Sequence, residues 1–199
     1  MTRAGIFFAI LAGPLALAGC ASPEPALYTL AAQPTLAAQR GTEIAPEAAR
    51  LKPRSVELRR IGLAGYLDRP GIVRAASAYR LDVAPDARWA APFGQMLERV
   101  IAENLELRLP GVSVVTQTGG IPTQPDRVLK LDIQRLDADP AGDMVLTAQA
   151  ALLDANGAHP TIRSFRITRR PASTATEDQV AAMSATVAGL ADDLARMLR

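Results

Sequence analysis

The stretch that decides the fold runs from Arg127 to Arg169 and reads RVLKLDIQRLDADPAGDMVLTAQAALLDANGAHPTIRSFRITR. Apolar and polar residues alternate along its first part, which is the period of a half-buried β-strand. The alternating apolar residues are Leu129, Leu131 and Ile133. The Asp139-Pro140-Ala141-Gly142 segment and the Asn156-Gly157 pair carry the residues of tight turns. These signals predict an antiparallel meander. The expected strands are residues 127–138, 144–154 and 161–169.

Two long helices are predicted outside the meander. After Thr176, apolar residues recur at steps of three and four, which places them on one face of a helix. They are Val180, Met183, Val187, Leu190, Leu194 and Met197. An earlier helix is expected from about Ala90 to the Pro110-Gly111 stop signal. Its apolar stripe is Phe93, Leu97, Val100, Ile101 and Leu105. Such stripes pack on a sheet, although the C-terminal one is also open to use as a short coiled-coil seam to a partner.

Shorter extended segments precede the meander. They are expected at residues 26–30, 55–61, 72–75, 78–83 and 112–116. Pro85 and Asp86 are expected to end a strand. The glycines and prolines of residues 62–71 predict a loop. Residues 31–53 are also expected to form a loop, whose role is unassigned. Together these elements predict an α+β fold with a mainly antiparallel sheet and two long helices packed on one face.

The N-terminus has the pattern of a bacterial lipoprotein signal. Residues 1–3 are short and basic, and residues 4–18 are apolar but too short to span a bilayer comfortably. Leu17-Ala18-Gly19-Cys20 then matches the lipobox, in which the cysteine thiol receives a diacylglycerol and cleavage makes the cysteine the new N-terminus. We therefore expect a signal peptide over residues 1–19, a lipidated N-terminus and spacer over residues 20–25, and one domain over residues 26–199. The alternative is an ordinary secretory signal with an incidental cysteine.

The residues around Cys20 also predict where the protein resides. Cys20 is the only cysteine, so it cannot form a disulfide within the chain. Two or three acyl chains on this residue would hold the protein firmly in a membrane. The next residue is Ala21, and the aspartate that usually retains lipoproteins in the inner membrane is absent. We therefore expect the outer membrane of a Gram-negative bacterium, with the domain facing the periplasm.

Charge and motif content do not favour an enzyme or a nucleic-acid-binding protein. The net charge is +2 and aromatic residues are 4% of the chain, without a dense basic patch interleaved with aromatics. No nucleophile elbow and no phosphate- or dinucleotide-binding glycine motif occurs. The single histidine, His159, fits an exposed turn, and a lone histidine gives no metal site with nitrogen and sulfur ligands. No catalytic residue, metal or cofactor is expected, although a carboxylate pair for glycoside hydrolysis stays open among the acidic residues 132–143.

Several blocks of sequence point to one family. In order along the chain, the blocks are Tyr66-Leu67-Asp68-Arg69-Pro70-Gly71-Ile72-Val73, Arg80-Leu81, Arg88-Trp89-Ala90 and Val100-Ile101-Ala102-Glu103-Asn104-Leu105. Together they resemble the ABC-type transport auxiliary (PqiC-like) lipoprotein family. The family pattern also begins with a lipobox and a Tyr-Thr-Leu strand, here Tyr28-Thr29-Leu30, and it closes with a long helix. The resemblance covers nearly all of the mature chain and departs from the family in the Ala-rich stretch after Leu30.

This resemblance implies a non-enzymatic lipoprotein of a periplasmic lipid-transport system that maintains the cell envelope. The implied partners are an MCE-domain periplasmic protein and, indirectly, an inner-membrane permease and ATPase. A homo-oligomer stays open, and a nucleic-acid partner is not expected. Two other classes remain: a structural envelope lipoprotein that assembles or stabilises outer-membrane machinery without handling lipid, and a lipid-modifying hydrolase.

The candidate partner-contact loop consists of Tyr66, Leu67, Asp68, Arg69 and Pro70. It joins an apolar pair to a charged pair, and the proline ring limits the freedom of the chain. Such a loop offers an amphipathic contact at a low cost in ordering entropy. The alternative is a rigid structural loop, in which Asp68 pairs with a nearby arginine or a backbone N–H group.

Overall fold

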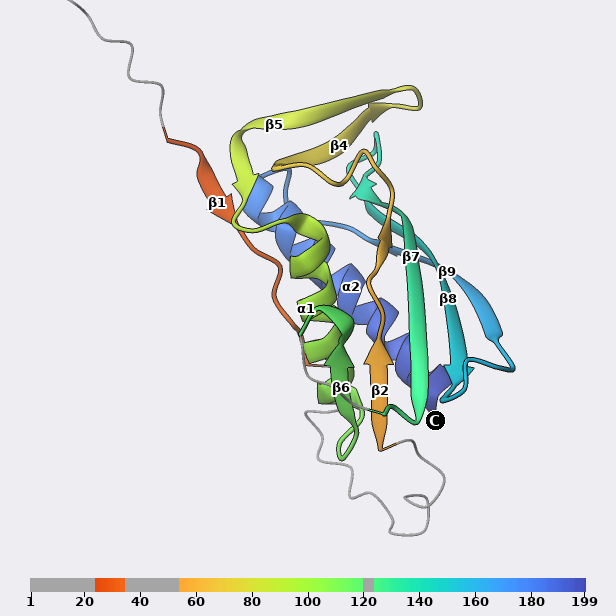
Figure 1. The fold of residues 1–199 in the computed structure, drawn as a ribbon. Helices are drawn as coiled ribbons and strands as arrows, with labels where there is room; N and C mark the ends of the chain where they lie inside the picture. Colours follow the sequence, from red (N-terminus) through yellow and green to blue (C-terminus); the bar gives the residue numbers. More distant parts are fainter. Residues whose placement is uncertain (1–23, 35–53, 120–123) are drawn as a thin grey trace, which may run out of the picture.

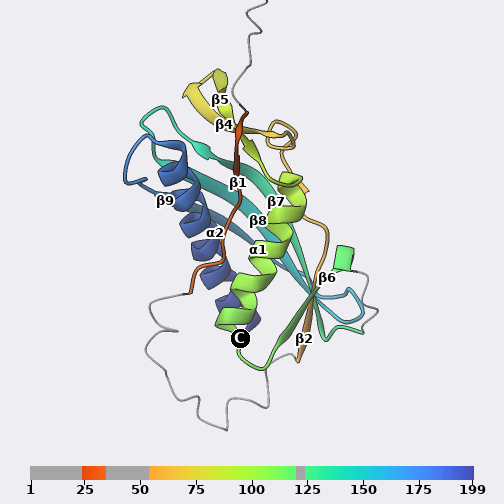
Figure 2. The same ribbon diagram turned by 90° about the vertical axis from the view of Figure 1, so that its left-hand side faces the viewer.

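The computed structural model describes residues 24–34, 54–119 and 124–199. The predicted signal peptide, Cys20 and residues 35–53 lie outside these ranges. The described chain forms one nine-stranded sheet, and two α-helices cover the same face of it (Figures 1 and 2). The elements are β1 (Ala26–Tyr28), β2 (Ser55–Leu58), β3 (Gly62–Leu63), β4 (Gly71–Ser77), β5 (Arg80–Trp89), α1 (Phe93–Arg108), β6 (Ser113–Thr116), a 3-10 helix (Gln117–Gly119), β7 (Arg127–Ala138), β8 (Met144–Asp154), β9 (Thr161–Arg169) and α2 (Thr176–Leu198). The predicted α+β class is confirmed.

The meander has the predicted bounds. β8 pairs antiparallel with both β7 and β9 along nearly its whole length. In the first turn, Asp139 accepts hydrogen bonds from the N–H groups of Ala141 and Asp143 through its side chain, and Gly142 adopts a φ of 86°. In the second turn, the Asp154 carboxylate accepts the N–H of Ala158. Local turn chemistry therefore fixes the register of these strands.

The other half of the sheet is partly parallel, which the sequence did not predict. The free edge of β7 pairs in succession with β2, β3 and β4, all in parallel. β6 is also parallel to β2, and β1 is parallel to β5. Parallel partners require long crossover connections, so their pairing leaves no turn signal between them in the sequence.

Strand β5 differs from its predicted end. The prediction that Pro85 and Asp86 stop the strand is wrong, because β5 continues to Trp89. The register between β4 and β5 shifts between the pairs Val73↔Val83 and Gly71↔Arg88, and Pro85 falls in this irregularity. A proline is tolerated at such a bulge because no ladder hydrogen bond needs its missing N–H. Gly71 is required here, since a Cβ atom on it would lie 2.3 Å from Cγ1 of Val83.

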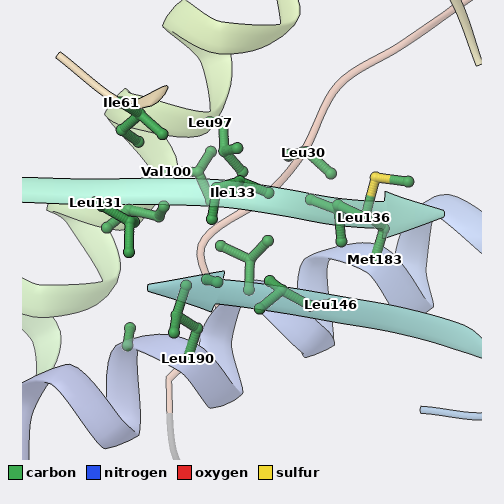
Figure 3. Close-up of a cluster of buried hydrophobic side chains, with 14 of the residues drawn as sticks. Leu30, Ile61, Leu97, Val100, Leu131, Ile133, Leu136, Leu146, Met183 and Leu190 are labelled. Carbon is green, nitrogen blue, oxygen red and sulfur yellow. The ribbon is translucent and has the colours of Figure 1, made fainter. Parts of the chain in front are cut away.

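The core lies between the sheet and the two helices (Figure 3). Both predicted apolar stripes face it, and only Met197 of the C-terminal stripe is half-buried. The largest fully buried side chains include Leu97, Ile101, Leu129, Ile133, Leu136, Leu146, Leu190 and Leu194. The apolar stripe of α2 therefore packs on the sheet inside the domain. Of its two predicted uses, packing on a sheet is the one the structure shows.

The chain after β1 runs between the two helices (Figure 2). Leu30 is buried there, and the Ala31 N–H donates to Oγ of Ser184 on α2. The Gln33 N–H donates to Oδ1 of Asn104 on α1 at 3.1 Å. These bonds tie residues 31–33 to both helices. Residues 31–34 have no regular secondary structure, which agrees with the predicted loop, and residues 35–53 lie outside the described ranges.

Candidate partner-contact site

The predicted anchor lies just before the described domain. Cys20 is outside the described residues, and the first described residue, Glu24, is two positions before β1. Among the described helices, none combines the length and the apolar character needed to cross a membrane.

The loop between β3 and β4 is ordered by backbone hydrogen bonds. The N–H of Leu67 donates to the carbonyl of Ala64 at 2.9 Å, and the N–H of Asp68 donates to the carbonyl of Gly65 at 3.3 Å. At its end, the Pro70 carbonyl accepts the N–H of Trp89 at 2.7 Å. The candidate partner-contact loop is therefore fixed at both ends, which keeps its conformational cost on binding low.

Two residues of the loop point into the domain. Leu67 is buried and lies beside Trp89, Phe93 and Leu136. The Tyr66 hydroxyl donates a 2.5 Å hydrogen bond to Oδ2 of Asp137, a buried residue of β7. Burial, and next this hydrogen bond to a carboxylate, raise the pKa of the Tyr66 hydroxyl well above its ordinary value.

An ion pair between Arg135 and Asp137 completes this network. Arg135 donates to Oδ1 of Asp137 from Nε at 2.9 Å and from Nη2 at 2.8 Å. Both carboxylate oxygens of Asp137 are thus occupied, which satisfies a charge that is only 2% exposed. Tyr66 and Leu67 hold the loop on the sheet, and their part of the loop is structural.

The other three residues of the loop face outward. Asp68, Arg69 and Pro70 are exposed. The structural alternative expected the Asp68 carboxylate to pair with an arginine or a backbone N–H group. Within the described ranges, neither the Asp68 nor the Arg69 side chain makes a hydrogen bond or an ion pair. This charged pair is available to a binding partner.

Asp68 also lies on the wall of a groove that the sequence did not reveal. The groove has a volume of about 410 Å³ and opens between the start of α1, the chain after β2 and the 3-10 helix. Its polar lining includes Arg60, Gln95, Glu98 and Thr118. The Glu98 side chain is buried, and Oε1 accepts the Thr118 hydroxyl at 2.9 Å. Glu98 lies off the apolar stripe of α1, so periodicity alone placed it on the solvent side of the helix.

The groove and the exposed end of the loop form one surface. It carries both signs of charge, since Asp68 is acidic and Arg60 and Arg69 are basic. A surface of this composition suits a protein partner with complementary charges more than an apolar ligand.

Three of the acidic residues 132–143, namely Asp137, Asp139 and Asp143, and the single histidine make contacts within the domain. Asp143 accepts Nε and Nη2 of Arg170 at 2.7 and 2.8 Å, and this contact lowers the pKa of its carboxyl. His159 lies in the exposed turn after β8, where its Nδ1 is 3.2 Å from Asp154. That contact, together with the N–H of Ala158, lowers the pKa of the Asp154 carboxyl. No group of His, Cys, Asp and Glu side chains suited to a metal ion occurs in the described part of the chain.

The described chain forms a small α+β domain with exposed charged residues beside a mixed sheet. The family model described as "ABC-type transport auxiliary lipoprotein component" matches residues 28–195, so the chain belongs to this family of auxiliary lipoproteins of ABC-type transport. The predicted family is confirmed, and it is a family of transport components.

Solved structures share this fold. A crystal structure of an uncharacterized protein superposes with a TM-score of 0.70 at 17% identity, over 89% of this chain and 100% of the other. Protein XCC0632 from Xanthomonas campestris superposes with a TM-score of 0.67 at 22% identity, over 87% of this chain and 95% of the other. At these identities the likeness shows the fold alone. No curated protein matches the sequence.

Proposed function

We propose that the chain is an outer-membrane-anchored periplasmic lipoprotein and a non-enzymatic auxiliary component of an MCE/ABC-type lipid-transport system that maintains the cell envelope. The observation that carries the proposal is the family match over residues 28–195 in a chain whose residues 17–20 fit a lipobox. The mature chain would begin at Cys20, four residues before the described domain.

The proposed partner is the MCE-domain protein of the same system, and the proposed contact is the exposed end of the loop. Asp68 and Arg69 are fixed by the turns before them and by the Pro70 carbonyl bond after them. Charged side chains on a pre-ordered loop bind with little loss of freedom. The inner-membrane permease and ATPase would be reached through the MCE protein.

The anchor is tested by Cys20→Ser in the full chain. We expect wild-type protein to fractionate with outer membranes and to carry a diacylglycerol on Cys20 by mass spectrometry. The variant should remain as an unacylated precursor or in the soluble fraction. A variant that fractionates with outer membranes like wild type would show that the lipoprotein assignment is wrong.

The loop is tested by calorimetry of the detergent-solubilised lipoprotein with the purified MCE-domain protein. The double variant Asp68→Ala with Arg69→Ala should bind about ten- to a hundred-fold more weakly, if the pair supplies one or two contacts of about 1–3 kcal/mol. Arg163→Ala is the matched control, because Arg163 is an exposed arginine on β9, away from the loop.

The outcomes separate the alternatives. Equal affinity of the double variant and wild type would remove the loop from the interface. If wild type does not bind the MCE-domain protein at all, the structural envelope lipoprotein becomes the better account.

A further inference from the structure

Exposed apolar side chains gather at one end of the molecule. Four of the six large hydrophobic residues exposed in the described ranges lie on β1 or on the β4–β5 hairpin. They are Leu27, Tyr79, Leu81 and Val83, and Tyr79 at the hairpin turn is fully exposed. Figures 1 and 2 show the hairpin at the end where β1 enters the fold. An exposed apolar cluster of this kind marks a contact surface.

The hairpin projects away from the rest of the sheet. β4 has one registered pair with β7, Arg74↔Ala138, and beyond it β4 pairs with β5 alone. Tyr79, Leu81 and Val83 are two residues apart along the chain, so Leu81 and Val83 within β5 share one face of the ribbon and Tyr79 continues that stripe at the turn. A two-stranded ribbon with an uncovered apolar face gains stability when that face is buried.

The direction of β1 brings the lipid anchor to the same end. β1 is parallel to β5, with Ala26 opposite Ala87 and Tyr28 opposite Trp89. β5 runs from the hairpin turn at Arg80 toward Trp89. Because β1 runs in the same direction, the chain just before Ala26 comes from the hairpin side. Cys20 precedes Glu24 by four residues, which span at most about 14 Å when fully extended. A bilayer that holds an acylated Cys20 lies within this reach of Glu24.

We propose that the β4–β5 hairpin is a membrane-contact element, whose face with Tyr79, Leu81 and Val83 rests in the headgroup region of the bilayer that holds Cys20. This inference rests on the acylation of Cys20 in the proposed function. Tyrosine is enriched at this depth because its ring is apolar and its hydroxyl reaches water. The exposed Arg80 beside the stripe pairs with Asp82, and this ion pair can stay in the hydrated headgroup region while the arginine stem lies in the interface.

The membrane is favoured over a protein as the occupant of this face. The tether is too short to let the hairpin move far from the bilayer, and the exposed stripe of Tyr79, Leu81 and Val83 carries no charged side chain. Two points of attachment, the acyl chains and the hairpin, would fix the orientation of the domain. β2 and β6, which lie at the end of the molecule opposite the hairpin, would then be far from the membrane (Figure 1).

The test uses the full-length acylated lipoprotein in vesicles of phosphatidylethanolamine and phosphatidylglycerol. An environment-sensitive fluorophore is attached at Tyr79→Cys, and separately at Ala78→Cys so that Tyr79 stays in place. The acylated Cys20 sulfur is a thioether and does not react. Ile162→Cys is the matched control, because Ile162 is 66% exposed on β9, at the edge of the sheet.

We expect the labels at positions 78 and 79 to emit at shorter wavelength in vesicles and to be quenched several-fold more strongly by brominated lipid than the label at position 162. Aqueous emission at 78 and 79 on protein whose mass shows acylated Cys20 would overturn the inference and leave the anchor in place. A blue shift without quenching, growing with protein density, would show a second copy on this face and would also overturn it. A mass without acyl chains would refute the proposed anchor and this inference together.

Discussion

Arg108, at the end of α1, connects three parts of the fold and gives the sharpest stability prediction. Its side chain is 3% exposed. Nε donates to Oδ1 of Asp192 on α2 at 2.7 Å. Nη1 donates to the Gln33 carbonyl at 3.1 Å, and to the carbonyl and Oδ1 of Asn104, both at 2.9 Å. Arg108→Ala removes all of these bonds at once.

The expected cost follows from what is left unpaired. Removal of one partner of a buried ion pair costs about 3–5 kcal/mol. Asp192 keeps 35% of its side chain in water, so the carboxylate is partly solvated and the low end applies. We expect a loss of about 3 kcal/mol. For a chain of this size that is a fall in melting temperature of about 6–12 °C, at about 2–4 °C per kcal/mol.

Calorimetry and hydrogen exchange together test this prediction. The chain at residues 30–33 should open more often in the variant, so the amide of Gln33 should exchange faster than in wild type. The control is Arg99→Ala, which removes an exposed ion pair with Glu103 on the same helix. That change should cost less than about 1 kcal/mol. The two variants could instead have the same melting temperature, with the Gln33 exchange rate unchanged in Arg108→Ala. That result would show that the hydrogen bonds of Arg108 do not hold the N-terminal segment.

Three further changes have defined outcomes. Leu190→Asp places a carboxylate at a fully buried position of α2 and should cost several kcal/mol, seen as loss of cooperative unfolding; an unchanged melting curve would contradict the helix packing. The folded state keeps Tyr66 protonated above pH about 10, where unfolded tyrosines lose their protons, so the free energy of unfolding should fall as pH rises beyond that value. Denaturant titrations at pH 9 and pH 11 should show a smaller fall for Tyr66→Phe than for wild type. Gly71→Ala should cost about 1–3 kcal/mol through its clash with Val83, and Val83→Ala in the same chain should restore part of it.

The meander and both helices could be predicted because their signals are local. Alternation over residues 127–133, the turn residues and the period of the two apolar stripes each fall within a few residues of the element they specify. Tertiary packing then agreed with the local preference, and the bounds of β7, β8 and β9 came out as expected.

The parallel half of the sheet could not be predicted in the same way. β2 has four residues and β3 has two, and their partners on β7 lie about seventy positions further along the chain. Pro85 was misread because a proline usually ends a strand. Its position in a bulge depends on the register with β4, which no local pattern encodes.

The candidate partner-contact loop was found through its resemblance to a family block, but its division into two parts needed the structure. Tyr66 points inward because its hydroxyl binds Asp137 on β7, which lies 71 positions later in the chain. The groove beside Asp68 likewise depends on the 3-10 helix that brings Thr118 to Glu98. Contacts of this separation leave no periodic trace in the sequence.

We propose above all that this lipoprotein serves an MCE/ABC-type lipid-transport system. The most direct measurement is mass spectrometry of the complexes that the full-length protein forms in its own cell envelope after crosslinking in intact cells. The account predicts an acylated Cys20 peptide together with peptides of an MCE-domain protein, and loss of the latter in the Asp68→Ala, Arg69→Ala variant. Recovery of the acylated protein with other outer-membrane machinery, and with no MCE-domain protein, would contradict it.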